Sequence, residues 1–405
     1  ISQFGDRIHQ LALVGLVAER ASGSTMDLAK LMSFTILPVF IIQPFAGVFV
    51  DRWDQKTTLF VCDCLRGVLV LTIPFLFFFG ESMVPIYVIV FLAFCCSRFY
   101  FPAKMSILPS LVDKNSLIAA NSLVSTTGMI AFVGGCALGG FLIDHFGARN
   151  GFIIDAATFF LSGLLIFSMD LSKRLRVNRG ELLKTGKEIV GPLRKSVWGE
   201  IREGFHYIVE HREIRSIINI VFTLMASAGA VYVVLIVFIQ ESFQSVTKDL
   251  GILAVCLGCG LFVGAMVYGK WGKRVAWHKT IFSSLFLGGV MLIIFAVIVW
   301  YYPNIMIAMF LSFFWGMVVG PIFIASNTVV HLVSDEHMRG KVFSALEIVI
   351  HFAFLIAMFI SSWVSERMSE RFVLISVGVI VTCVGAFGFL KKRISTVAFD
   401  GSNMA

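Results

Sequence analysis

Charged residues are scarce in this sequence. Asp, Glu, Lys and Arg together make up 14% of the 405 residues, whereas 58% of the residues are hydrophobic. A water-soluble protein of this length would need far more charge to cover its surface. The scarcity therefore excludes a soluble globular protein and indicates a protein embedded in a bilayer, where each helical crossing needs about 20 apolar residues.

The sequence also lacks the short motifs that carry most enzymatic chemistry. It contains no HExxH zinc motif, no GxSxG nucleophile elbow, no acyltransferase-like His-x-x-x-x-Asp and no phosphate-binding loop that would couple ATP hydrolysis to work. No stretch resembles the filter of a channel. These absences argue against an enzyme, an ATP-driven pump and a channel.

Cysteine offers no clear chemistry either, although eight are present and all fall within apolar segments. The close pairs are Cys62/Cys64, Cys95/Cys96 and Cys256/Cys259. CxxC spacing can hold a metal or support redox chemistry, but no His or carboxylate stands beside the last pair. We interpret these residues as small packing side chains, and we expect neither a metal nor another cofactor.

What the sequence does have is twelve long apolar runs, each of which predicts a membrane-spanning helix. We therefore predict an all-α polytopic membrane protein. The predicted helices are 1–18, 28–50, 57–80, 84–103, 116–143, 150–170, 214–240, 248–269, 279–301, 303–331, 341–364 and 371–390. The first begins at residue 1, which is Ile and not Met, so a short leader is expected before it.

One long hydrophilic segment divides the twelve helices into six and six. The predicted parts are an N-terminal six-helix bundle at 1–170, a cytoplasmic linker at 171–213, a C-terminal six-helix bundle at 214–393 and a tail at 394–405. Within the linker, Ile201, Phe205 and Ile208 recur at helical spacing. That pattern predicts an amphipathic helix on the membrane surface.

The two halves resemble each other. DRWDQK at 51–56 aligns with GKWGKR at 269–274, and the turn predicted to open at Pro102 aligns with the segment that opens at Pro321. The offsets of 218 and 219 residues are nearly equal. Repeated halves are typical of secondary transporters, in which one half rocks against the other around a site near the bilayer midplane.

Basic residues are unevenly distributed over the predicted loops. If both termini are cytoplasmic, the cytoplasmic segments hold 24 Lys and Arg residues and the outer loops hold six. The positive-inside rule therefore predicts cytoplasmic termini, in a bacterial inner membrane. The same bias accounts for the net charge of +8, so no nucleic-acid partner is expected.

The stretch GVFVDRWDQK resembles the loop motif between helices 2 and 3 of the major facilitator superfamily, Gly-x-x-x-Asp-Arg-x-Gly-Arg-Lys. The matching residues are Gly47, Asp51, Arg52 and Lys56. Asp54 stands where the motif has Gly, and Gln55 where it has Arg. The resemblance implies two pseudo-symmetric six-helix bundles, and it implies that the matching residues form a conformational latch between them.

Further stretches extend this resemblance over the whole chain. SRFYFPAK places Arg98 in the fourth helix, where the family often carries a buried Arg. GCALGG resembles the antiporter motif Gly-Pro-x-x-Gly-Gly, with Cys136 in place of Pro. The glycines that match, and that would let helices approach closely, are Gly135, Gly139 and Gly140.

QFGDRIHQLAL, EIREGFHYIVEH and MRGKVFSALE are similar to segments of the macrolide-efflux-like branch of drug:proton antiporters. That branch also includes siderophore exporters and relatives of the lysophospholipid transporter, which YFPAKMSIL resembles as well. The resemblance implies proton-coupled export, with a lipid flippase or a siderophore exporter as alternatives.

A few ionisable side chains lie within the predicted helices, where they are costly and hence functional candidates. The candidates for proton coupling are Asp6, Arg98, Glu347 and His351. Asp6 and Arg98 could form a switch in which the approach of the Arg favours the carboxylate. Glu347 and His351 share a helix face, and a His there could titrate near neutral pH. A permanent ion pair, a helix-end position of Asp6 and a simple hydrogen bond are the alternatives.

Two further sets of ionisable side chains are interpreted without a role in proton coupling. Asp63 and Arg66, three residues apart, predict a structural pair near the cytoplasmic end of the third helix. Asp155 is expected near the outer surface.

Polar residues that could line a substrate cavity are scattered among Phe, Met, Leu and Ile. They are Gln10, Gln43, Asn219, Tyr232 and Asn327. This mixture favours an amphipathic or hydrophobic substrate over a sugar. We therefore predict a monomeric secondary transporter that exports small amphipathic molecules in exchange for protons. A metal exporter has little support.

Overall fold

The computed structural model shows a helical membrane protein. The residues that it describes are 1–20, 23–50, 53–76, 82–113, 116–169, 199, 202–203, 206, 212–271, 277–333 and 339–390. Regular secondary structure within these residues is helical. The linker residues Ile201, Phe205 and Ile208 lie outside them, so the surface helix stays a prediction.

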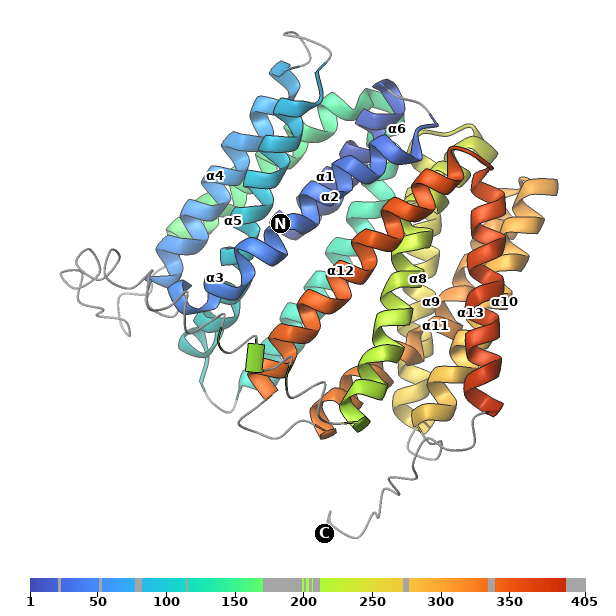
Figure 1. Ribbon diagram of the computed structural model, residues 1–405. Helices are drawn as coiled ribbons and strands as arrows, with labels where there is room; N and C mark the ends of the chain where they lie inside the picture. Colours follow the sequence, from blue (N-terminus) through green and yellow to red (C-terminus); the bar gives the residue numbers. More distant parts are fainter. Residues whose placement is uncertain are drawn as a thin grey trace.

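Two bundles of helices lie side by side (Figure 1). The first contains α1 (Ser2–Arg20), α2 (Thr25–Ile41), α3 (Gln43–Val50), α4 (Gln55–Leu76), α5 (Val84–Leu111) and α6 (Leu117–Ser168). The second contains α8 (Arg212–Phe243), α9 (Lys248–Trp271), α10 (Trp277–Tyr301), α11 (Ile305–Val333), α12 (Arg339–Ser365) and α13 (Glu370–Leu390).

The helix α6 contains two of the predicted spans. Its 52 residues would reach about 78 Å if straight, far more than a bilayer of about 30 Å needs. Gly147 has φ 81° and ψ 162°, a conformation that suits glycine, and it interrupts the helix. The chain folds back there. The short distance across Gly147 shows the reversal: a Cβ atom at Gly151 would lie only 3.0 Å from the side chain of Ile143.

The span predicted at 28–50 is instead two helices, α2 and α3. They meet at Ile42, whose backbone N–H donates to the carbonyl of Pro38 at 2.9 Å. Pro44 follows in the first turn of α3 and has no N–H to continue the helical ladder. The break therefore falls where the ladder loses a donor.

The turn predicted at Pro102 is wrong, because α5 continues through both Pro102 and Pro109. Each proline removes a helical hydrogen bond. Ala103 and Ile107 are nevertheless buried in a cluster with side chains of α3, α4 and α6, and membrane helices tolerate proline where neighbours pack closely. Tertiary packing thus outweighs the local signal. Pro321 likewise lies within α11.

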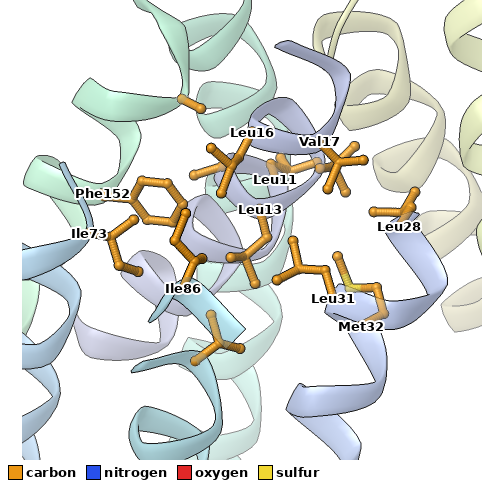
Figure 2. Packing of buried hydrophobic residues seen from close by; sticks show 14 of the residues in the cluster. Leu11, Leu13, Leu16, Val17, Leu28, Leu31, Met32, Ile73, Ile86 and Phe152 are labelled. Atoms are coloured by element: carbon orange, nitrogen blue, oxygen red, sulfur yellow. The ribbon is translucent and has the colours of Figure 1, made fainter. Parts of the chain in front are cut away.

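The largest core of the described residues centres on α1. Leu13 and Leu16 are fully buried there, and they pack with Leu31 of α2, Ile86 of α5 and Phe152 of α6 (Figure 2). The same cluster also includes Val237 of α8 and Met358 of α12, so α1 packs against its own bundle and against the second half.

Large apolar side chains also cover much of the outer surface, among them Phe101, Phe141, Phe167, Phe310 and Phe387. Nine of the described helices have the length and hydropathy to cross a membrane. One of them, α6, crosses twice, and α1 and the α2–α3 pair occupy the two remaining predicted spans. The twelve-span, all-α membrane fold is thus confirmed.

The two halves meet through equivalent helices. The N-terminal half of α6 packs against α9, and α2 packs against α12. A pseudo-two-fold axis that exchanges the bundles converts one contact into the other, since α2 corresponds to α9 and the first leg of α6 to α12. This relation supports the two-bundle symmetry.

Candidate functional site

A cavity of about 530 Å³ lies between the halves. Most of its wall comes from α8, α9, α10, α11 and α13 of the second half, and α1 and α6 close its remaining side. Apolar side chains such as Leu257, Leu292, Phe295 and Trp315 dominate the wall. The volume falls within the range of small-molecule sites, about 300–1,000 Å³.

The side of the cavity formed by α1 includes two polar side chains, those of Arg7 and Gln10. Arg7 lines it and donates from Nη1 to Oε1 of Gln10 at 2.8 Å. The guanidinium also lies 5.1 Å from the ring centre of Phe132 on α6, a cation–π distance. Arg7 is thereby held at the boundary between the apolar wall and the first half.

Of the predicted cavity residues, Gln10 and Tyr232 do line this cavity, whereas Gln43 and Asn219 do not. Gln43 instead accepts a hydrogen bond from Arg98 at 3.3 Å, and Asn219 is exposed on α8. The side chain of Asn327, on α11, lies outside the described residues.

A buried ion-pair cluster lies inside the first half around Arg66. Its guanidinium donates to Asp63 one turn earlier on α4, and it lies 3.5 Å from Oδ1 of Asp6 on α1. Tyr100 and Phe159 face it at 4.4 and 4.3 Å from their ring centres. Arg66 is thus enclosed by two carboxylates and two aromatic rings.

This geometry changes two expectations. The sequence predicts that Asp6 pairs with Arg98, but in the structure Asp6 faces Arg66. The pair of Asp63 and Arg66 is present, although it lies near the middle of α4 and is buried rather than near the cytoplasmic end. Side-chain direction around a helix axis determines such pairs, and the hydropathy pattern carries little information about it.

Sequence reasoning missed a second buried pair, His9 with Asp155. Nδ1 of His9 lies 3.0 Å from Oδ2 of Asp155, at ion-pair distance but without the angles of a hydrogen bond. Asp155 was expected near the outer surface, yet it is fully buried. The signal was available, because both are ionisable residues inside membrane helices.

The remaining coupling candidates lie on α5, which carries Arg98, and on α12, which carries Glu347 and His351. His351 contacts Glu347 within α12, with Nδ1 2.8 Å from its backbone carbonyl oxygen and 3.4 Å from Oε2. The two residues therefore share a helix face, as predicted.

Comparison with known proteins identifies the family. The model of the Major Facilitator Superfamily matches residues 1–358. The chain belongs to the Major Facilitator Superfamily. It is accordingly a membrane transporter.

Relatives within the superfamily span nearly the whole chain. The uncharacterized MFS-type transporter YfiS of Bacillus subtilis (strain 168) is 24% identical over 408 residues, which cover 98% of this chain and 91% of the relative. The multidrug efflux pump Tap of Mycobacterium tuberculosis (strain ATCC 25618 / H37Rv) is 25% identical over 392 residues, which cover 94% and 88%.

Solved structures of the superfamily fold resemble the chain as well. A bacterial homologue of the iron transporter ferroportin in an inward-facing state aligns with a TM-score of 0.72 at 14% identity, covering 96% of this chain and 95% of the other. A bacterial homologue of the human lysosomal transporter Spinster gives 0.65 at 14% identity, with the same coverage. At such identities the likeness shows the fold alone.

The superfamily loop motif is only partly described. Asp51 and Arg52 lie outside the described residues and Gly47 falls within α3, so the latch stays a prediction. Lys56 donates to the carbonyls of Phe167 and Met169 at the end of α6, within the same half. Its charge thus stabilises a helix C-terminus there.

Asp54, which replaces the motif's Gly, caps the start of α4. Its Oδ2 accepts from the backbone N–H of Thr57 at 2.8 Å, and its backbone carbonyl accepts from the hydroxyl of Thr58. A capping carboxylate is a preferred residue at this position, which gives the departure from the motif a structural reason.

The glycines of GCALGG lie where helices approach closely. A Cβ atom at Gly135 would be 2.7 Å from Cβ of Arg7, and one at Gly139 would be 3.2 Å from the Ile8 side chain, both on α1. Gly140 faces α9 of the second half. The motif therefore packs α6 against its own bundle and against the other one.

Proposed function

We propose that this superfamily member exports amphipathic or hydrophobic small molecules in exchange for protons. The observation that carries the proposal is the cavity between the halves, whose lining is mostly apolar. A sugar site would need a denser set of amides and carboxylates. The similarity to Tap, a multidrug efflux pump, supports export rather than uptake.

We further propose a monomer in a bacterial inner membrane with both termini in the cytoplasm. The 24 basic residues on one side against six on the other support this orientation. The end of the molecule at Gly23 then faces outward. Hydrogen bonds join the halves at that end, between Ser24 and Glu366 and between Asp144 and the backbone of Val246. The described conformation is then the one closed to the outside.

Asp6 is our candidate for the group that carries the coupling proton. Its side chain is 40% exposed, whereas its partner Arg66 is buried. A carboxylate that is accessible and sits beside a buried cation can exchange a proton, and protonation would weaken its attraction to Arg66. That change could bias the equilibrium between two conformations. Glu347 and His351 are the alternative carriers.

The test uses proteoliposomes that contain a pH-sensitive dye and maintain an imposed proton gradient. Amphiphiles from macrolides to lysophospholipids are added, and wild type is compared with Asp6→Asn and Glu347→Gln. We expect substrate-dependent proton flux that Asp6→Asn abolishes. Asp27→Asn, at an exposed ion pair with Lys30, is the matched control and should retain the flux.

Three results would contradict parts of the proposal. Unchanged flux in Asp6→Asn would remove that residue as the carrier, and loss in Glu347→Gln alone would transfer the role to the α12 pair. Lipid movement between leaflets without proton flux would point to a lipid flippase instead.

A further inference from the structure

Among the described residues that line the cavity, the guanidinium of Arg7 carries the one full charge. Asp, Glu, Lys and His are absent from the described residues that line the cavity. The other polar side chains of the lining are neutral, and they are Gln10, Ser227, Tyr232, Ser284 and Ser312. The site is therefore apolar with one cation at its edge.

No carboxylate in the described part of the chain lies within ion-pair distance of Arg7. Successive residues of a helix point about 100° apart, so the neighbouring Asp6 points in a different direction from Arg7. Asp6 lies beside Arg66 instead. Arg7 holds Gln10 with one of its five N–H donors, and Phe132 covers it through its ring rather than through an oxygen. The cation is positioned but is not neutralised by these contacts.

An unneutralised cation in an apolar membrane cavity is costly. A bound carboxylate, sulfonate or phosphate would remove that cost, because guanidinium binds these planar or tetrahedral anions through two parallel hydrogen bonds. A cationic substrate would meet like charge and find no acidic partner in the lining. The remaining wall offers only apolar surface and hydroxyl groups.

We propose that this cavity selects amphipathic molecules with an anionic head group, which Arg7 binds while the apolar body packs against the second half. The inference rests on the proposed function and specifies its substrate class. The anion can belong to a water-borne organic acid or to a lipid head group, and the chemistry that Arg7 recognises is the same.

The test measures binding to the full chain in nanodiscs with two fluorescent probes. 8-Anilinonaphthalene-1-sulfonate (ANS) and N-phenyl-1-naphthylamine (NPN) share an apolar body and differ by the sulfonate. We expect wild type to bind ANS about tenfold more tightly than NPN, the effect of one charge-assisted contact. Arg7→Gln should abolish that preference, and Arg7→Lys should keep part of it.

Controls separate a lost anion site from a damaged protein. Unchanged affinity for NPN shows that the cavity of Arg7→Gln is intact. Arg367→Gln removes a cation that stacks on Trp363 at the far end of α12 and should bind ANS as wild type does. Displacement of ANS by lysophosphatidic acid supports the lipid source, and displacement by 1-pyrenebutyrate alone supports the water-borne one.

The inference is overturned if ANS and NPN bind wild type equally, or if Arg7→Gln keeps the preference for ANS. If either result is found and neutral or cationic amphiphiles still drive proton flux, the anion site is rejected and the proposed export function is retained. Conversely, an Arg7-dependent preference for ANS with no substrate-dependent proton flux would leave the anion site standing and contradict proton-coupled export.

Discussion

At the scale of single residues, Arg66 is the cation of an ion-pair cluster inside the first half. Its charge is shared between the buried carboxylate of Asp63 and the partly exposed carboxylate of Asp6, while the side chain of Arg66 itself is buried. Breaking such a buried pair by removing one partner costs about 3–5 kcal/mol, because the other charge stays buried alone. Arg66→Gln should therefore lower the Tm of the purified protein by several degrees.

Two comparisons make this prediction specific. The double variant Asp63→Asn with Arg66→Gln should recover part of the lost Tm, since removing both charges is far less costly than removing one. Lys30→Gln breaks an exposed pair with Asp27, at 2.8 Å, and should change the free energy of unfolding by less than about 1 kcal/mol. An Arg66→Gln variant as stable as wild type would contradict the stabilising role.

At the scale of elements, the approach of α6 to α9 depends on small residues. A Cβ atom at Gly251 would collide with the carbonyl oxygen of Cys136, and one at Gly140 would lie 2.7 Å from the carbonyl oxygen of Thr247. Gly251→Ala should therefore separate the two helices and expose the buried Cys136. In a background with Cys136 as the only cysteine, we expect its labelling by a membrane-impermeant maleimide to rise several-fold.

The same helix supplies the control. Gly269 lies on α9 with no atom within 4 Å of an added Cβ, so Gly269→Ala should leave the labelling of Cys136 unchanged. Equal labelling in both variants would mean that the glycine contact does not hold the helices together.

The sequence predicts the membrane-spanning helices better than it predicts the contacts between side chains. Apolar runs predicted the twelve spans because the bilayer imposes a length and an apolar surface on each crossing. The break at Ile42 and the continuous helix through Pro102 depend on local donors and on packing partners, which a hydropathy average does not contain. The partner of Asp6 depends on the rotation of three helices about their axes, so Arg66 could be recognised only in the assembled bundle.

At the scale of the whole molecule, two matching contacts close the end at Gly23. Glu366, after α12, accepts from the backbone N–H of Met26 at the start of α2, at 3.0 Å. Asp144, near the end of the first leg of α6, accepts from the N–H of Val246 just before α9, at 2.8 Å. In each case a carboxylate of one half caps a helix of the other, and the pseudo-two-fold axis relates the two caps.

Removing a capping side chain costs about 0.5–2 kcal/mol, and here the cost falls only on the conformation in which the halves touch. The double variant Asp144→Ala with Glu366→Ala should therefore shift the equilibrium toward the conformation open at this end, by about fivefold or more. Spin labels on the exposed residues Asn150 and Gln244 would report this shift as a larger population of long distances in pulsed electron resonance.

The control is Glu370→Ala, which removes an acceptor that bonds Ser365 within one half and should leave the distance distribution as in wild type. Were the double variant also to keep the wild-type distribution, closure would rest on the apolar and glycine contacts of α6 with α9 and of α2 with α12, and the paired caps would serve only to satisfy the helix ends.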